Sequence, residues 1–163
     1  MSVGVLVGCA GPNAAPPPEG TIAAPPHTPE TTGDEARVTE AYERFWDVTH
    51  SLPHLPGEQR SAELTAVAVE RLAATMLQNL TAQQDQGLTP YGETHARISA
   101  VKVDGDRAVV TDCQDASRSG QAELATGQPR TVGIARNPVS GTLERGADGT
   151  WRVARIDYPQ GSC

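Results

Sequence analysis

The spacing of apolar residues changes near the middle of the chain, from steps of three and four to alternation. Between Asp34-Glu35 and Leu52-Pro53 the apolar side chains recur at helical spacing, which predicts one long amphipathic helix. The two acidic residues suit the first turn of a helix, and the proline ends it. The predicted buried stripe consists of Val38, Ala41, Tyr42, Phe45, Trp46 and Thr49.

A second helical region follows the turn at Leu55-Pro56-Gly57 and closes at Gln83–Gly87. Gly87 suits the position just after a helix, where a left-handed backbone is common. The length of the region fits either one long helix or two helices with a break near Ala73–Thr75. Its apolar positions are Leu64, Val67, Ala68, Leu72, Met76, Leu77 and Leu80.

Alternation begins in the next segment, where two β-prone runs flank Asp104-Gly105. This dipeptide accepts the backbone angles of a tight turn, so Thr94–Val103 and Arg107–Asp115 are predicted to form a hairpin. One face of the hairpin is then apolar, and helices can pack on it. The side chains that share this face are Val101, Val103, Ala108 and Val110.

Three further strand candidates complete the pattern: Thr131–Ala135, Thr142–Arg145 and Trp151–Tyr158. Asn137-Pro138 separates the first two, and a glycine-rich turn at 146–149 precedes the third. Leu88–Tyr91 is interpreted as a connector, and Gln114–Gln128 as a long loop or a weak edge strand. Helices followed by a curved antiparallel sheet of four or more strands predict an α+β fold, a cone whose mouth can hold a ligand.

The first 33 residues of the chain have a different composition. Seven of the 13 prolines fall within the first 29 residues, and residues 10–33 are rich in Pro and Ala. Such a segment buries too little apolar surface to offset its ordering entropy, so a disordered tether is predicted. The cone-shaped domain is then expected over residues 34–163.

The charge distribution argues against nucleic acid as a partner. The formal net charge is −7, with nine acidic and four basic residues in 34–86 and nine of each in 87–163. Binding to phosphates needs a positive face, and neither half provides one.

The segment Leu6-Val7-Gly8-Cys9 resembles the lipobox of bacterial lipoproteins, in which the cysteine is acylated. We therefore expect Cys9 to be the lipidation site and membrane lipid to be a partner. No Lys or Arg precedes Cys9, so we expect a truncated signal over residues 1–9, from an upstream start codon or a truncated reading of the gene. The alternative is a small buried cysteine in an N-terminal strand.

A wider resemblance rests on the order of several short motifs. These are the lipobox, the tether, Ala41–Trp46, Asp112–Asp115, Asp148–Val153 and Gly161–Cys163. Together they resemble small secreted lipoproteins of high-GC Gram-positive bacteria with a nuclear transport factor 2-like (cystatin-like cone) domain. The resemblance implies a lipid anchor on the outer face of the cell membrane. It implies little about activity, because the superfamily includes isomerases, dehydratases, cyclases and non-catalytic domains.

The expected redox state of the two remaining cysteines depends on this localisation. In an exported protein with Cys9 lipidated, Cys113 and Cys163 meet an oxidising environment, and we expect them to form a disulfide. The alternative is two free thiols, which a cytosolic protein would favour.

Candidate catalytic residues come from the isomerase-like relatives, which use a carboxylate and a tyrosine inside the cone. The side chains here that fit those roles are Tyr42, Tyr91, His95, Asp112 and Asp115. A working pair needs a desolvated carboxylate and a tyrosine aimed at a developing oxyanion. No catalytic motif of the family maps onto these positions. The alternative is a core tyrosine with solvated acids at the end of the hairpin.

His50 and His54 have a helical metal-ligand spacing, but Pro53 ends the helix between them and no third ligand joins them. We expect no metal and no cofactor.

Two functions follow. The favoured one is a non-catalytic, membrane-anchored lipoprotein that binds an envelope protein or a small ligand, and a component of a secretion or conjugation apparatus is a weaker variant. The alternative is a cone-fold isomerase, dehydratase or cyclase acting on a small hydrophobic molecule. An enzyme needs an apolar pocket with an inward carboxylate and tyrosine, whereas an adaptor needs a filled cone or an exposed apolar patch.

Overall fold

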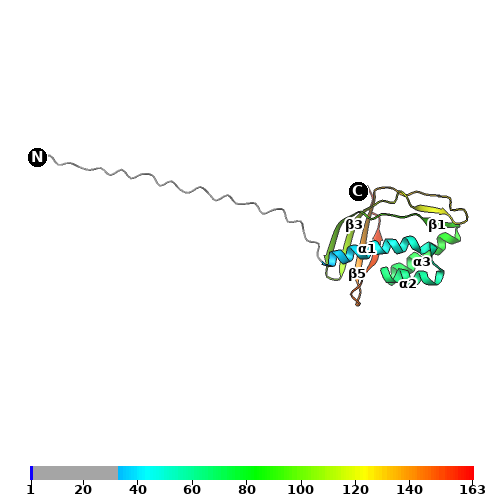
Figure 1. Ribbon diagram of the computed structural model, residues 1–163, viewed down its shortest axis with the longest axis horizontal. Helices are drawn as coiled ribbons and strands as arrows, with labels where there is room; N and C mark the ends of the chain where they lie inside the picture. The colour runs from blue at the N-terminus through cyan, green and yellow to red at the C-terminus, as the bar shows by residue number, and fades with distance from the viewer. Residues whose placement is uncertain (2–32) are drawn as a thin grey trace. The chain divides into compact units, whose positions relative to one another are not determined.

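Helices precede strands in the computed structural model, which describes Met1 and residues 33–163 (Figure 1). The expectations for Cys9, the signal and residues 10–32 of the tether lie outside the described residues. The helices are α1 (Gly33–Ser51), the short 3₁₀ helix η1 (Leu52–His54), α2 (Gly57–Val67) and α3 (Glu70–Asp85). The strands are β1 (Leu88–Tyr91), β2 (Ile98–Asp104), β3 (Arg107–Gln114), β4 (Gly120–Glu123), β5 (Asn137–Arg145) and β6 (Trp151–Asp157).

Helix α1 carries most of the aromatic core. Its buried residues are Val38, Tyr42, Phe45 and Trp46, which lie on the predicted stripe. The rings of Phe45 and Trp46 meet edge to face with their centroids 5.2 Å apart. The helix ends at Ser51, just before Leu52-Pro53, as the sequence predicts.

The second helical region is two helices, but the predicted break at Ala73–Thr75 is wrong. The break lies at Ala68 and Val69, which are both extended. Ala68 forms a parallel bridge with Val153 of β6, and the Val69 N–H donates to the Val153 carbonyl at 2.9 Å. A contact with a distant strand therefore ends α2, which local sequence cannot show. Gly87 has φ +73° after α3, as predicted.

The strands form an antiparallel sheet in the order β2-β3-β5-β6 and a smaller sheet of β1 and β4. In the hairpin, Asp104 pairs with Arg107, so the loop is Gly105-Asp106, one residue beyond the predicted position. Moving the loop by one residue shifts each cross-strand partner by two, which keeps the same side chains on each face. The predicted apolar face is therefore present, with Val103 opposite Ala108 and Val101 opposite Val110.

Strand β5 is longer than predicted. It runs through Asn137-Pro138, while Thr131–Ala135 is not a strand. Pro138 is the second residue of β5, and the pairing with β6 begins only at Ser140. A proline is tolerated there because a missing N–H disturbs a sheet least near a strand end.

The small sheet is formed by segments whose apolar alternation is too weak to predict strands. Leu88–Tyr91, interpreted as a connector, is β1, and it pairs with β4 from the segment interpreted as a loop or weak edge strand. Gly120 of β4 leaves room for the backbone of Thr131, because a Cβ there would lie 2.2 Å from the Thr131 carbonyl oxygen.

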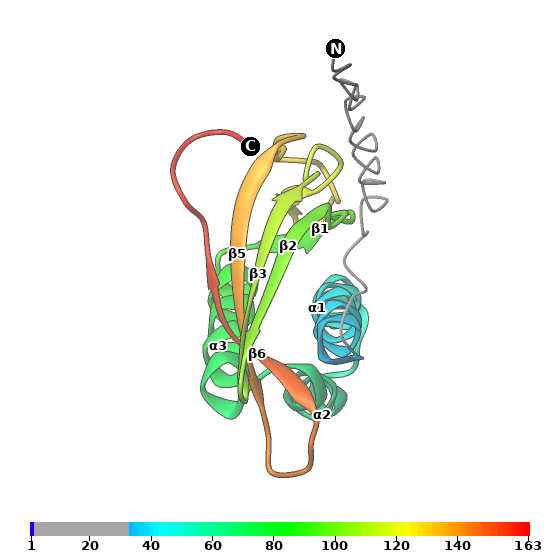
Figure 2. The ribbon, with the colours of Figure 1, turned by 90° about the vertical axis from the view of Figure 1, so that its left-hand side faces the viewer.

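The helices and the larger sheet share one core. Helix α1 packs against β2, β3, β5 and β6, and Figure 2 shows it beside one face of that sheet. Helices α2 and α3 both contact β6. This arrangement confirms the predicted α+β fold. Among the helices described, none combines the length and hydrophobicity needed to span a bilayer.

Candidate functional site

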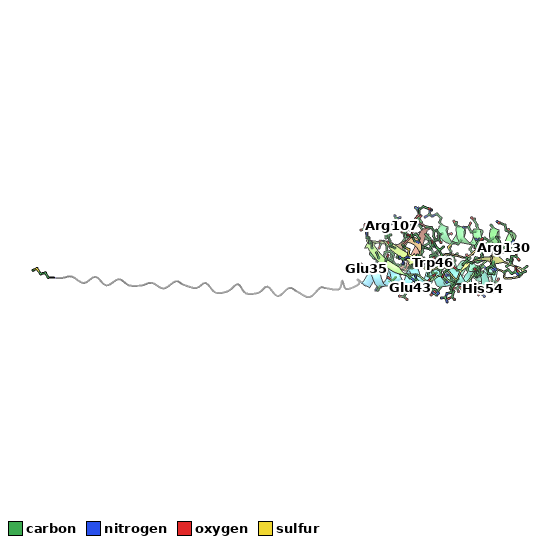
Figure 3. The ribbon with its side chains drawn as sticks, turned by 90° about the horizontal axis from the view of Figure 1, so that it is seen from above. Glu35, Glu43, Trp46, His54, Arg107 and Arg130 are labelled. Carbon is green, nitrogen blue, oxygen red and sulfur yellow. A yellow bond between two sulfur atoms is a disulfide. The ribbon has the colours of Figure 1, made fainter. Side chains whose placement is uncertain are left out.

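A cavity of about 410 Å³ lies between the C-terminal part of α1, helix α3 and the small sheet. Trp46 and His50 of α1 form one wall, and Met76 and Gln83 of α3 form another. In Figure 3, Trp46 lies near the middle of the domain and His54 lies toward the end that carries Arg130. Two helices that the apolar spacing predicts therefore form walls of this cavity.

The lining of the cavity is apolar with neutral polar groups. No Asp, Glu, Lys or Arg is among the described residues that line it, although 20% of the chain is charged. Polar groups come from the side chains of Thr49, Asn79 and Thr94, among others, and Tyr158 contributes from beyond the end of β6.

His50 is a neutral group of this lining. Its Nε2 accepts the backbone N–H of Thr94 at 3.1 Å and lies 2.7 Å from the Thr94 Oγ1. Because a backbone N–H only donates, Nε2 is the unprotonated nitrogen. Burial is the largest effect on this ring, and it lowers the pKa of His50. The imidazole also stacks on Trp46, with ring centroids 6.4 Å apart.

One buried polar atom on a cavity-lining side chain, Gln83 Oε1, has no hydrogen-bond partner among the described residues. The Trp46 indole N–H donates to the Tyr42 oxygen, and this hydrogen bond lowers the pKa of that phenol against the larger effect of burial. Leaving a buried polar group unsatisfied costs about 1–3 kcal/mol, so the Gln83 amide oxygen favours a polar partner.

Tyr42 and Asp112, two of the predicted candidates, meet in the core. The Tyr42 hydroxyl donates to Asp112 Oδ2 at 3.0 Å, and the Arg97 backbone N–H donates to Oδ1 at 2.6 Å. The side chains are buried, with exposed fractions of 0% for Tyr42 and 1% for Asp112. Burial raises the pKa of both groups.

This pair does not line the cavity. Each carboxylate oxygen of Asp112 is held by a donor from the protein itself, so the pair joins α1 to β3. The burial of Asp112 follows from the alternation of inward and outward side chains along β3. Asp112 and Gln114 continue the inward positions of Ala108 and Val110, so an acid in that register is a buried one.

The other candidates lie apart from Tyr42 and Asp112. Asp115 forms an ion pair with Arg97, and hydrogen bonds from the Ser117 side chain and backbone lower the pKa of Asp115. His95 Nε2 lies 2.7 Å from the Arg118 guanidinium.

Tyr91 does line the cavity, but its hydroxyl donates to the Thr131 carbonyl at 3.0 Å. The predicted set of five is therefore split between the core, the surface and the cavity wall.

Cys113 and Cys163 lie at bonding distance, with sulfur atoms 2.10 Å and Cα atoms 5.6 Å apart. The bond joins the end of the chain to β3. Across the described residues, no three His, Cys, Asp or Glu side chains are grouped so that they could hold a metal ion.

Sequence reasoning missed Gln83 as a lining residue. The apolar stripe of α3 includes Met76 and Leu80, and Gln83 follows at the next helical step on the same side. A polar residue at a stripe position was the available signal. It marks the place where the helix face leaves the core and meets the cavity.

Comparison with known proteins finds similar structures but no matching family model or curated sequence. A ketosteroid isomerase-like protein from Erwinia carotovora atroseptica is similar over 77% of this chain and 94% of its own, with 15% identity and a TM-score of 0.52.

Two other structures match with lower scores. A conserved protein from Planctomyces limnophilus covers 76% of this chain and 92% of its own, at 16% identity and TM-score 0.44. A protein from Catenulispora acidiphila covers 76% and 89%, at 16% identity and TM-score 0.48. At these identities the likeness concerns the fold, and the match to the isomerase-like protein supports the predicted cone.

Proposed function

We propose that this protein is a lipid-anchored binding domain on the outer face of the cell membrane, and that it holds a small, mainly apolar molecule without transforming it. The observation that carries the proposal is the cavity between α1, α3 and the small sheet. Its volume of about 410 Å³ lies within the usual range of small-molecule sites.

The position of the Tyr42–Asp112 pair supports binding without catalysis. A general acid or base must reach the proton that it transfers, directly or through one water. Tyr42 and Asp112 are outside the cavity lining and hold each other in the core. An isomerase-type reaction in the cavity would lack both groups.

The support for a lipid anchor comes from the amino-acid sequence. The segment Leu6-Val7-Gly8-Cys9 supports acylation of Cys9, and residues 10–32 supply a Pro/Ala-rich connection to the folded domain. The Cys113–Cys163 bond fits an oxidising compartment, because disulfides are rare in the cytosol. By this reasoning the protein belongs with the small secreted lipoproteins of high-GC Gram-positive bacteria.

The anchor is tested by the intact mass of protein purified from its own cells. A diacylglyceryl cysteine at position 9 as the first residue is the expected result, and Cys9→Ser is the unacylated control. An unmodified Met1 or Ser2 terminus would rule out the lipoprotein.

Binding is tested with the full chain carrying Cys9→Ser and the uncharged fluorophore N-phenyl-1-naphthylamine. We expect saturable fluorescence that is lost in Met76→Trp, which fills the cavity from α3, and in Thr49→Phe, which fills it from α1. Ala62→Trp, on the exposed face of α2, is the control and retains binding. Equal binding by all four proteins, or none by the parent, contradicts the proposal.

A further inference from the structure

We propose that the cavity selects uncharged ligands carrying a hydroxyl or a similar hydrogen-bonding group, which pairs with the Gln83 side chain. This inference rests on the proposed binding function and names the chemistry of its ligand. It follows from the charge of the lining, the state of His50 and the unpartnered amide oxygen of Gln83.

The charge of the lining is the first argument. No ionised side chain of the described lining residues faces the cavity as a counter-charge. A carboxylate, phosphate or ammonium group would lose its hydration on entry and gain no ion pair in return. Uncharged ligands do not meet this penalty.

His50 does not supply the missing positive charge. Protonation of Nε2 would set an N–H against the backbone N–H of Thr94, which now donates to that nitrogen at 3.1 Å. The titratable groups that act on the ring from outside are Asp47, Glu93 and His95. Asp47 and Glu93 line a neighbouring hollow that shares His50 with the cavity, so their negative charges further disfavour an anionic ligand.

The Gln83 side chain is the polar contact for the ligand. The residue lies half-buried on the α3 wall beside Asn79 and Leu80, and its Oε1 is enclosed by protein without a partner. In our proposal the flexible side chain turns about its χ angles to bring this amide to the ligand. A hydroxyl both donates and accepts, so it satisfies this amide in either orientation.

The test uses competitors that differ only in their head group. N-phenyl-1-naphthylamine is displaced from the full Cys9→Ser chain by 1-octanol, octanoate or octylammonium at about pH 7.5, where the last two are charged. We expect 1-octanol to compete at a concentration at least about tenfold lower than either ion. If either ion competes as well as the alcohol, the inference is wrong, while the binding function stands.

Variants of Gln83 test the contact itself. Gln83→Leu keeps the size of the side chain and removes its polar group, so 1-octanol should compete about three- to tenfold less well. Gln83→Glu places a carboxylate in the same position and should make octylammonium the best competitor. An unchanged order of competitors in both variants overturns the role of Gln83. Failure of the fluorophore to bind the parent chain instead overturns the proposed function.

Discussion

At the level of single residues, the hydrogen bond between Tyr42 and Asp112 joins the first helix to the central hairpin strand. Tyr42 also packs closely on β5, because a Cβ at Gly141 would lie 2.5 Å from its ring. Asp112 has a second donor in the Arg97 backbone. The residues that resemble a catalytic pair therefore serve the packing of α1 on the sheet.

Tyr42→Phe tests this structural role. The change removes the donor and leaves Asp112 Oδ2 buried without its partner, so we expect the free energy of unfolding to fall by about 1–3 kcal/mol. Urea denaturation measures the loss. Tyr91→Phe is the matched control, since its hydroxyl bonds a carbonyl in an exposed setting, and its effect should stay within about 0.5 kcal/mol. Equal losses in the two variants would contradict the assignment.

His50 gives the stability a dependence on pH. Burial lowers its pKa in the folded protein, against smaller opposing effects of Glu93 and Asp47. As the pH falls through about 6.5, the unfolded chain takes up a proton that the folded protein binds less readily, so stability decreases on acidification.

We expect this decrease between about pH 7.5 and about pH 5.5, measured by urea denaturation at each pH. In His50→Gln, which keeps an acceptor for Thr94, the slope should be smaller. An identical slope in the two proteins would show that another group is responsible.

At the level of elements, the sequence predicts the helices and strands that have a regular apolar spacing. It does not predict the contacts that these elements make with distant parts of the chain. The stripe of α1 and the faces of β2 and β3 follow from spacing alone. The end of α2 at Ala68 depends on a bridge to Val153, a residue far along the chain. Strands β1 and β4 are short and weakly alternating, so their pairing is set by the chain around them rather than by their own residues.

The hairpin loop offers a test at this scale. Gly105 has φ +57°, a conformation that a residue with a Cβ adopts at a cost of about 1–2 kcal/mol. We therefore expect Gly105→Ala to lower the free energy of unfolding by about that amount. Gly57→Ala in α2 is the matched control, because no atom lies within 4 Å of its added Cβ and no left-handed backbone is required. It should be neutral or stabilising by about 0.5–1 kcal/mol. If both variants behave alike, the loop assignment is wrong.

At the level of the whole molecule, the disulfide fixes the end of the chain. Residues 159–163 are exposed beyond β6, and Cys163 is bonded to Cys113 across a separation of 50 residues. The sequence indicated this pairing only through the expected export. The cavity was harder to foresee, because its walls come from α1, α3, β1 and β4, and half of those elements carried weak sequence signals.

Removing the disulfide with Cys113→Ser and Cys163→Ser should lower the free energy of unfolding by about 2–4 kcal/mol, since the unfolded chain regains the freedom of the closed loop. Thermal unfolding of the oxidised parent and the double variant measures the effect. Thiol titration of the single Cys113→Ser variant should find one more free thiol than the parent. Unchanged stability would show that the bond has no structural role.

The central claim is that the cavity binds an uncharged, mainly apolar molecule through Gln83. A crystal structure of the full Cys9→Ser chain with bound 1-octanol tests it most directly. The account predicts the alkyl chain between α1 and α3, with the hydroxyl within hydrogen-bonding distance of the Gln83 amide. Octanol bound elsewhere on the surface, with the cavity filled by protein side chains, would contradict it.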